Sequence, residues 1–288
     1  MKQVTLFLTL VLYALCSCSV LEQRSDCQAP VSIQVDNFSF LQEDFPTKAP
    51  QAVADYSGVK AITLGFYASD GTEQYKKTQL RADAETYDTF GQFDCSLPLG
   101  SYTMVVLGYG SEVPITLTSA SSASYTEDKV RETFVYSQTV NVDDITPLTL
   151  SATLSRIIAR LSIISTDVKP ANVASLRYVF SKGSKSFNPT TGLAADDNGF
   201  TNIVALESET GEITKTLSNL FLVTDEETMD VTIESLDASG NVLYRKTVQN
   251  IPFKRNRATI MTGSLFSVAA NIGFSVETSF LTEYRMSF

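Results

Sequence analysis

Short runs in which apolar residues alternate with polar ones recur along the chain, and this pattern narrows the fold most. Val31, Ile33 and Val35 follow it near the start, and residues 59–68 follow it again before the turn at Asp70-Gly71. A period of two places such residues on one face of a strand. Asp-Gly between two runs is typical of a β-hairpin. Because no amphipathic helix longer than three turns accompanies these runs, the sequence predicts an all-β protein built from sandwiches.

A polar break near the middle of the chain indicates two domains. Residues 143–147 (DDITP) end in a proline, which a sheet ladder does not accommodate. Residues 148–165 then alternate and predict one long strand, whereas residues 118–128, rich in serine, threonine and alanine, predict a surface loop. A mature chain of about 270 residues is long enough for two cores. We therefore expect an N-terminal domain over residues 18–147 and a C-terminal domain over residues 148–288.

The first eighteen residues predict export. Lys2 supplies a positive charge, residues 4–15 form an apolar run, and Leu15-Cys16-Ser17-Cys18 closes it. A run this short does not cross a hydrocarbon core of about 30 Å as a helix, whereas this order of charge, apolar stretch and small residue is typical of a secretory signal. The last four residues resemble a bacterial lipobox, which implies that residues 1–17 are a lipoprotein signal peptide and that Cys18 is lipidated. An ordinary signal peptide with incidental cysteines is the alternative.

A lipidated Cys18 would hold the protein to a membrane without a spanning helix, because its acyl chains insert into the bilayer. Ser19 resembles the sorting residue of outer-membrane lipoproteins. We therefore expect the protein at the cell outer membrane. The side of that membrane on which its body lies stays open.

Two further cysteines remain in the mature chain, Cys27 and Cys95. An exported protein occupies a space that permits disulfides. We therefore expect these two residues to pair across the first domain. Two free, buried thiols are the alternative.

The composition disfavours several classes of function. A net charge of −10 argues against a nucleic-acid partner. The absence of histidine removes Ser–His triads and the usual zinc sites. The absence of tryptophan weakens the case for a platform on which sugars stack, although the 12 tyrosines could still provide one. Asp196-Asp197-Asn198-Gly199 lacks the alternating ligands and the closing glutamate of an EF-hand, so we interpret it as a solvated turn. We expect no cofactor, no metal and no enzyme activity.

Charged clusters are the remaining surface candidates. Asp143-Asp144 and residues 225–227 (DEE) predict solvated charge, because nothing places these adjacent acids across a catalytic cleft. Lys254, Arg255 and Arg257 form the main basic cluster. This cluster either contacts an acidic partner or is the outer face of an edge strand, where charge discourages aggregation.

The last stretch of the chain, residues 274–288, alternates throughout. The residues on its apolar face are Phe274, Val276, Thr278, Phe280, Thr282, Tyr284, Met286 and Phe288. This period predicts a strand, which bends or divides near Thr282 because strands usually run about 3–10 residues. Exposed apolar side chains of this size would invite aggregation. The strand therefore completes either its own sandwich or that of a neighbouring subunit.

Several segments, taken in order, resemble the fimbrial subunits and fimbrial anchor lipoproteins of Bacteroidales-type (type V) fimbriae, the fimbrillin-like family. The matching pieces are the lipobox, residues 62–64 with Asp70-Gly71, residues 97–102 (LPLGSY), residues 154–160 (LSRIIAR), and residues 250–259 (NIPFKRNRAT) with Gly263 after them. The resemblance implies two tandem transthyretin-like Greek-key sandwiches. It also implies a structural role, with other fimbrial subunits as partners through strand exchange and with residues 274–288 as the donated strand.

The sequence does not decide which position the protein occupies in such a fimbrium. Residues 26–30 (DCQAP) resemble the anchor branch, whereas residues 154–163 resemble stalk proteins equally well. Stalk maturation needs a basic cleavage site after the first strand, and Lys48 is the only basic residue of the loop 46–50. This departure favours an uncut anchor or accessory subunit and leaves a stalk or tip role open. The alternative function is a surface binding lipoprotein or tip adhesin that recognises a glycan or host ligand.

Overall fold

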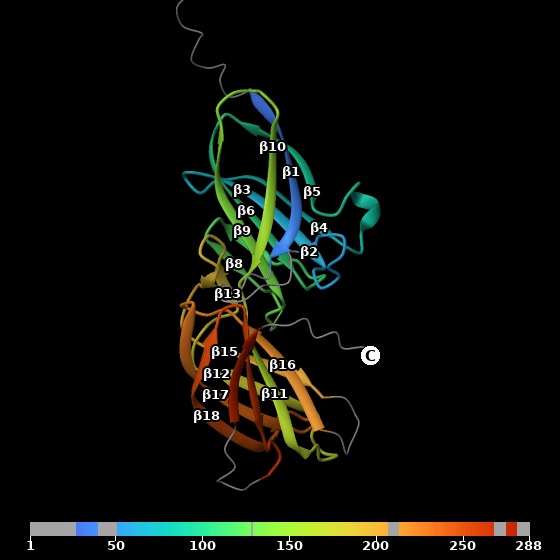
Figure 1. Cartoon of the computed structure of the whole chain (residues 1–288), viewed down its shortest axis with the longest axis vertical. Coiled ribbons are helices and arrows are strands. Elements are labelled where there is room, and N and C mark those ends of the chain that lie inside the picture. The colour runs from blue at the N-terminus through green and yellow to red at the C-terminus, as the bar shows by residue number, and fades with distance from the viewer. Residues whose placement is uncertain (1–26, 40–50, 128, 207–212, 268–274, 281–288) are drawn as a thin grey trace, which may run out of the picture.

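The structure is a computed structural model that describes residues 27–39, 51–127, 129–206, 213–267 and 275–280 (Figure 1). Strands joined by turns and loops make up these residues, and the one helical segment among them is the short 3-10 turn Ala84–Thr86. The predicted all-β fold is confirmed. Within the same described residues, no helix has the length and apolar character needed to span a membrane.

The N-terminal half, drawn at the top of Figure 1, is one sheet that folds over into two layers. Its strand order is β2-β1-β10-β9-β6-β3-β4, with β5 also paired to β1. Apolar side chains of β1, β5 and β10 pack there against those of β3, β6 and β9. The strands are β1 (Gln28–Ser39), β2 (Gln51–Ala52), β3 (Ala61–Ala68), β4 (Glu73–Leu80), β5 (Gln92–Pro98), β6 (Gly100–Tyr109), β9 (Thr133–Val142) and β10 (Leu148–Arg156).

The alternation read from the sequence explains how β1 packs. Val31, Ile33 and Val35 are buried as predicted. The pairing of β1 with β10 then shifts by one residue between Val35 and Asn37. Because of this bulge, Phe38 rather than Asn37 enters the core.

Gln79 joins the outer strands of the two layers. It is buried in β4, where its Nε2 donates to Gln92 O at 2.6 Å and its Oε1 accepts from Gly91 N at 2.7 Å. One side-chain amide thus satisfies two backbone groups at the start of β5, as a neighbouring strand would. It closes the seam between β4 and β5.

The C-terminal half consists of two four-stranded sheets whose apolar faces meet in a second core. One sheet has the order β16-β11-β19-β20 and the other the order β15-β12-β17-β18. The tandem Greek-key arrangement of the two halves stays a prediction. The strands are β11 (Ala159–Val168), β12 (Ser175–Phe180), β15 (Phe200–Ala205), β16 (Ile213–Leu220), β17 (Glu226–Leu236), β18 (Val242–Lys254), β19 (Arg257–Gly263) and β20 (Ser275–Phe280).

The single strand predicted over residues 148–165 is wrong. β10 pairs in parallel with β1 of the N-terminal sheet, whereas β11 belongs to a C-terminal sheet. Between them, Ile157 N donates to Thr133 O and Ile158 O accepts from Asn256 N, so these residues bond to different halves. The two-domain division stays a prediction, and from these pairings we place its boundary at Ile157-Ile158 rather than at Leu148.

A third, small sheet joins the two halves at the waist of the molecule (Figure 1). Its order is β14-β13-β8-β7, with β7 (Thr116–Ser119) and β8 (Ser122–Ser124) from the first half and β13 (Ser186–Asn188) and β14 (Leu193–Ala194) from the second. Tyr125 stacks on Phe221 with ring centroids 6.3 Å apart, and Phe187 packs on Phe221 at 4.4 Å. The predicted surface loop over residues 118–128 is therefore wrong in part, because β8 and the buried Tyr125 lie within it.

Candidate functional site

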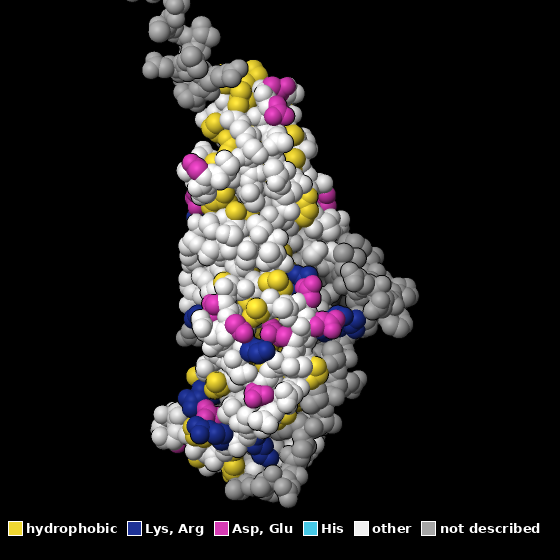
Figure 2. Space-filling view, turned by 90° about the vertical axis from the view of Figure 1, so that its left-hand side faces the viewer, with side chains coloured by type: hydrophobic (Ala, Val, Ile, Leu, Met, Phe, Trp, Pro, Cys, Tyr) yellow, Lys and Arg dark blue, Asp and Glu magenta, His cyan; other side chains and the backbone are white. Residues whose placement is uncertain are grey.

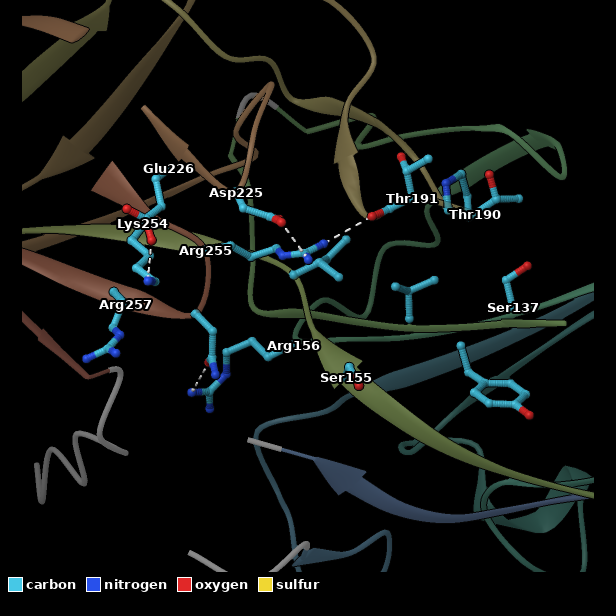
Figure 3. A pocket seen from close by; sticks show the side chains of 15 residues that line it. Ser137, Ser155, Arg156, Thr190, Thr191, Asp225, Glu226, Lys254, Arg255 and Arg257 are labelled. Atoms are coloured by element: carbon cyan, nitrogen blue, oxygen red, sulfur yellow. Dashed lines mark hydrogen bonds and ion pairs between the residues drawn. The ribbon is translucent and has the colours of Figure 1, made fainter. Parts of the chain in front are cut away.

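A cleft of about 580 Å³ opens where the two halves meet (Figure 3). Five segments line it: residues 135–137 of β9, residues 155–157 at the end of β10, residues 189–191 between β13 and β14, residues 225–226 at the start of β17, and residues 254–257 between β18 and β19. Both halves thus contribute walls to one site.

Backbone hydrogen bonds hold the turn between β18 and β19 in place. Asn256 has a φ of 59°, in the left-handed region that asparagine adopts more readily than most residues. Its N–H donates to Ile158 O at 2.7 Å, while Arg255 N donates to Asp225 O at 2.8 Å. The turn is therefore fixed to two other segments of the cleft.

Two ion pairs lie along the cleft and are drawn as dashed lines in Figure 3. Arg255 Nη2 lies 2.7 Å from Asp225 Oδ1, and Arg255 Nη1 donates to Thr191 O at 3.0 Å. Lys254 pairs with Glu226. Because the Asp225 and Glu226 side chains are 66% and 62% exposed, each pair contributes at most about 1 kcal/mol. An incoming anion can therefore displace these carboxylates at a small cost in free energy.

Arg156 also lines the cleft, and its side chain is held more firmly than those of Lys254 and Arg255. Its side chain is 2% exposed, and its Nη2 lies 2.6 Å from Glu132 Oε1. Its guanidinium carbon stands 5.3 Å from the centroid of the Phe134 ring. Glu132 also accepts a hydrogen bond from Tyr56. Burial, and then the Glu132 charge, raise the pKa of that phenol well above its usual value.

The cleft is locally basic on an acidic protein. Its lining includes four cationic side chains and two carboxylates, whereas the whole chain carries a net charge of −10. Figure 2 shows acidic and basic side chains intermingled over the waist and the lower half of one face. The sequence singled out residues 225–227 and the cluster of Lys254, Arg255 and Arg257 as separate surface features. The structure brings them together and adds Arg156, which the sequence marked only as part of the motif at residues 154–160.

Residues 113–287 match the model of a family of unknown function, DUF6562. The chain belongs to this family. The matched span covers the small joining sheet, every segment of the cleft and the C-terminal half. Among curated proteins, none matches the chain.

Solved structures similar to this family member include fimbrial proteins of the class that the sequence resembles. The fimbrial anchor protein Mfa2 from Porphyromonas gingivalis is 11% identical, with a TM-score of 0.48 over 88% of this chain and 97% of that chain. The C-terminally truncated tip fimbrial protein Mfa3 from the same organism is 10% identical, with a TM-score of 0.41 over 88% and 99%. A candidate adhesin from Bacteroides ovatus is 12% identical, with a TM-score of 0.48 over 90% and 97%.

The predicted disulfide between Cys27 and Cys95 is wrong. Both thiols are free, Cys27 exposed and Cys95 half-buried. In the register of β1 and β5, Cys95 lies opposite Val31, four residues along the chain from Cys27. Four residues of strand span about 13 Å, whereas bridged cysteines have Cα atoms no more than about 7 Å apart.

The first part of the predicted donor segment lies in its own sheet. β20 pairs antiparallel with β19, with Val276 opposite Met261 and Phe280 opposite Arg257. Phe274, Tyr284, Met286 and Phe288 lie outside the described residues, as do Cys18 and Ser19. Donation of the strand and lipidation of Cys18 stay predictions.

Asp167 fastens the segment that follows β19. Its Oδ1 accepts from Leu265 N at 2.8 Å and its Oδ2 from Phe266 N at 2.8 Å. The Ser165 hydroxyl donates to Oδ1 at 2.6 Å, and Ser264 donates to Oδ2. Burial alone would raise the pKa of Asp167, but these four hydrogen bonds outweigh it and hold the pKa below its usual value.

The acidic loop after β14 uses its carboxylates locally. Asp196 accepts from the Ser184 hydroxyl and from Asn198 N, and Asp197 accepts from Gly183 N. Within the described part of the chain, no group of three or more histidine, cysteine, aspartate or glutamate side chains could hold a metal ion.

Proposed function

We propose that this protein is a lipid-anchored anchor or accessory subunit of a cell-surface fimbrium that holds the next subunit by strand addition. One observation carries this proposal: β20 lies at the edge of its sheet, beside β19. An edge strand can leave its sheet with the loss of one ladder of hydrogen bonds. The same backbone groups can then pair with the edge of a neighbouring subunit.

The register supports such an exchange. Six residue pairs join β19 to β20, from Arg257 opposite Phe280 to Thr262 opposite Ser275. A strand donated between subunits would form the same kind of ladder elsewhere. The net free-energy change is therefore small, as in domain swapping. The Asp167 hydrogen bonds would keep Ser264 to Phe266 docked while the strand beyond them moves.

A covalent lock tests strand donation. Thr262→Cys with Ser275→Cys, in a Cys27→Ser, Cys95→Ser background, places two thiols directly opposite each other on β19 and β20. We expect the oxidised lock to prevent co-purification of fimbrial subunits with the protein, and reduction to restore it. The two single-cysteine variants are the controls. Undiminished capture of subunits by the locked protein would refute donation of β20.

Cys18→Ala tests the lipid anchor separately. Because residues 15–18 resemble a lipobox, we expect the variant to remain an uncleaved precursor and to be lost from the outer-membrane fraction. Metabolic lipid labelling of the variant is the measurement, and a label that persists would show that Cys18 is not the acylated residue.

The alternative function, recognition of a glycan or host ligand, is favoured by a different observation. The cleft between the two halves is large, basic and formed by segments held together by hydrogen bonds.

A further inference from the structure

We propose that the cleft at the waist binds an acidic saccharide, with the carboxylate of the sugar at the turn between β18 and β19. This inference specifies the ligand class of the alternative function at the cleft and rests on it, whereas strand donation concerns a different site and is tested separately. The volume of about 580 Å³ lies within the range of about 300–1,000 Å³ that is usual for small-ligand sites. A short oligosaccharide fits a space of this size.

The basic turn supplies the carboxylate site. Lys254, Arg255 and Arg257 come from one turn and line one cavity. The two carboxylates paired with Lys254 and Arg255 are exposed, so a ligand carboxylate replaces them without leaving a buried charge unpaired. The planar guanidinium of Arg255 matches a carboxylate through two parallel hydrogen bonds.

Hydroxyl groups occupy the other side of the cleft. Figure 3 shows Lys254 and Arg257 on one side, and Ser137, Thr190 and Thr191 on the other. Sugar hydroxyls both donate and accept, so serine and threonine hydroxyls suit them. Asp225 and Glu226, once displaced from their cations, become acceptors for the same hydroxyls.

The walls favour a compact ligand over an extended peptide. Peptide capture by strand addition needs an open ladder of backbone groups. At the cleft, β9 and β10 are already paired with each other, Val135 with Ser155 and Phe134 with Arg156. Residues 189–191 and 255–256 are turns. Along β9, β10 and these turns, the cleft therefore offers side chains rather than a strand edge.

The site is also preformed. Arg255 bonds through its backbone to Asp225 and through its side chain to Thr191 O, and Asn256 bonds to Ile158. A ligand that enters a site already held in place loses less free energy to ordering.

Titration calorimetry of the full mature protein tests the proposal with three carboxylate-bearing probes: trigalacturonate, a glucuronate-containing hyaluronan tetrasaccharide and 3′-sialyllactose. Each is paired with its neutral counterpart, namely the two carboxyl-reduced oligosaccharides and lactose. We expect saturable binding of at least one acidic probe, at least tenfold tighter than its neutral counterpart. Failure of all three acidic probes to bind would overturn the proposal, as would equal binding of the neutral ones.

Matched variants locate the site. Lys254→Gln with Arg257→Gln should weaken binding of the acidic probe about tenfold. Lys76→Gln with Lys77→Gln removes the same charge from β4, far along the chain from the cleft, and should change it less than twofold. Asp225→Asn should tighten binding, because Arg255 loses its competing carboxylate, whereas a purely structural role of Asp225 predicts no tightening. Equal effects of the two double variants, or unchanged binding in the cleft variant, would place the ligand elsewhere.

Discussion

Arg156 and Glu132 form an ion pair with 2.6 Å between Nη2 and Oε1, and this pair ties the end of β10 to the residue just before β9. Glu132→Gln would leave the buried guanidinium without its counter-charge. We expect the free energy of unfolding to fall by about 3 kcal/mol, measured by urea denaturation. Glu73→Gln is the matched control, because its pair with Lys76 is exposed and contributes less than about 1 kcal/mol. Equal losses in the two variants would contradict the role given to burial.

Asp167 should make stability depend on pH. Its folded pKa is lower than that of an unfolded aspartate, about 3.9. The stabilisation is therefore complete above that unfolded value and is lost as the pH falls through the folded pKa. Asp167→Asn should be clearly less stable than the parent at pH 7, and the difference should shrink below about pH 4. A difference in unfolding free energy that stays constant from pH 7 to pH 2 would show that the carboxylate charge is not the cause.

Gln79→Leu should open the seam between β4 and β5. The substitution leaves Gly91 N and Gln92 O without their partner, and each buried backbone group left so costs about 1–3 kcal/mol. We expect a total loss of about 2–6 kcal/mol in unfolding free energy, summed over the two groups. Gln74→Leu, on an exposed position of the same strand, should stay within about 0.5 kcal/mol of the parent. A neutral Gln79→Leu would mean that water satisfies both groups.

The two free thiols should differ in reactivity. Burial, together with the nearby Asp94 charge, raises the pKa of Cys95 to about 11. At pH 8, Cys95 should therefore react with a thiol reagent at least about 100-fold more slowly than free cysteine. The exposed Cys27 should react quickly, and unfolding should make both accessible. If neither residue is labelled in the unfolded protein until a reductant is added, the two form a disulfide after all.

Alternation in the sequence predicted individual strands well, because burial on one face is a local property. Val31, Ile33 and Val35 are one example. Ile62, Leu64 and Phe66 are also buried as predicted, although in β3 the opposite face is covered as well. It failed at Ile157-Ile158, where both residues are apolar and no turn residue marks the passage from one sheet to the other. In β10 the even-numbered residues face inward, as Leu154 does, whereas in β11 the odd-numbered ones do, as Leu161 does. That reversal depends on which strands pair, and pairing is not a local property.

The cleft illustrates the same limit. The sequence marked the acidic run 225–227 and the basic cluster 254–257, but it gave no reason to expect them together. Their contact depends on the pairing of β17 with β18, where Glu226 lies opposite Lys254. The disulfide prediction failed for a related reason, because the register of β1 and β5 decides which residues meet.

The small sheet shared by the two halves also constrains the order in which the chain can fold. β8 pairs with β13, so residues 116–124 have no partner strand from the second half until residues 186–194 have been made. Phe187 and Phe221 belong to the cluster that covers Tyr67 and Leu107 on the outer face of the first sheet, so this cluster stays incomplete until residue 221 has been made. Transiently uncovered apolar surface of this kind is prone to aggregation. The first half therefore completes its packing only when the second half is present. Truncation before residue 194 should yield an insoluble product rather than a smaller folded protein.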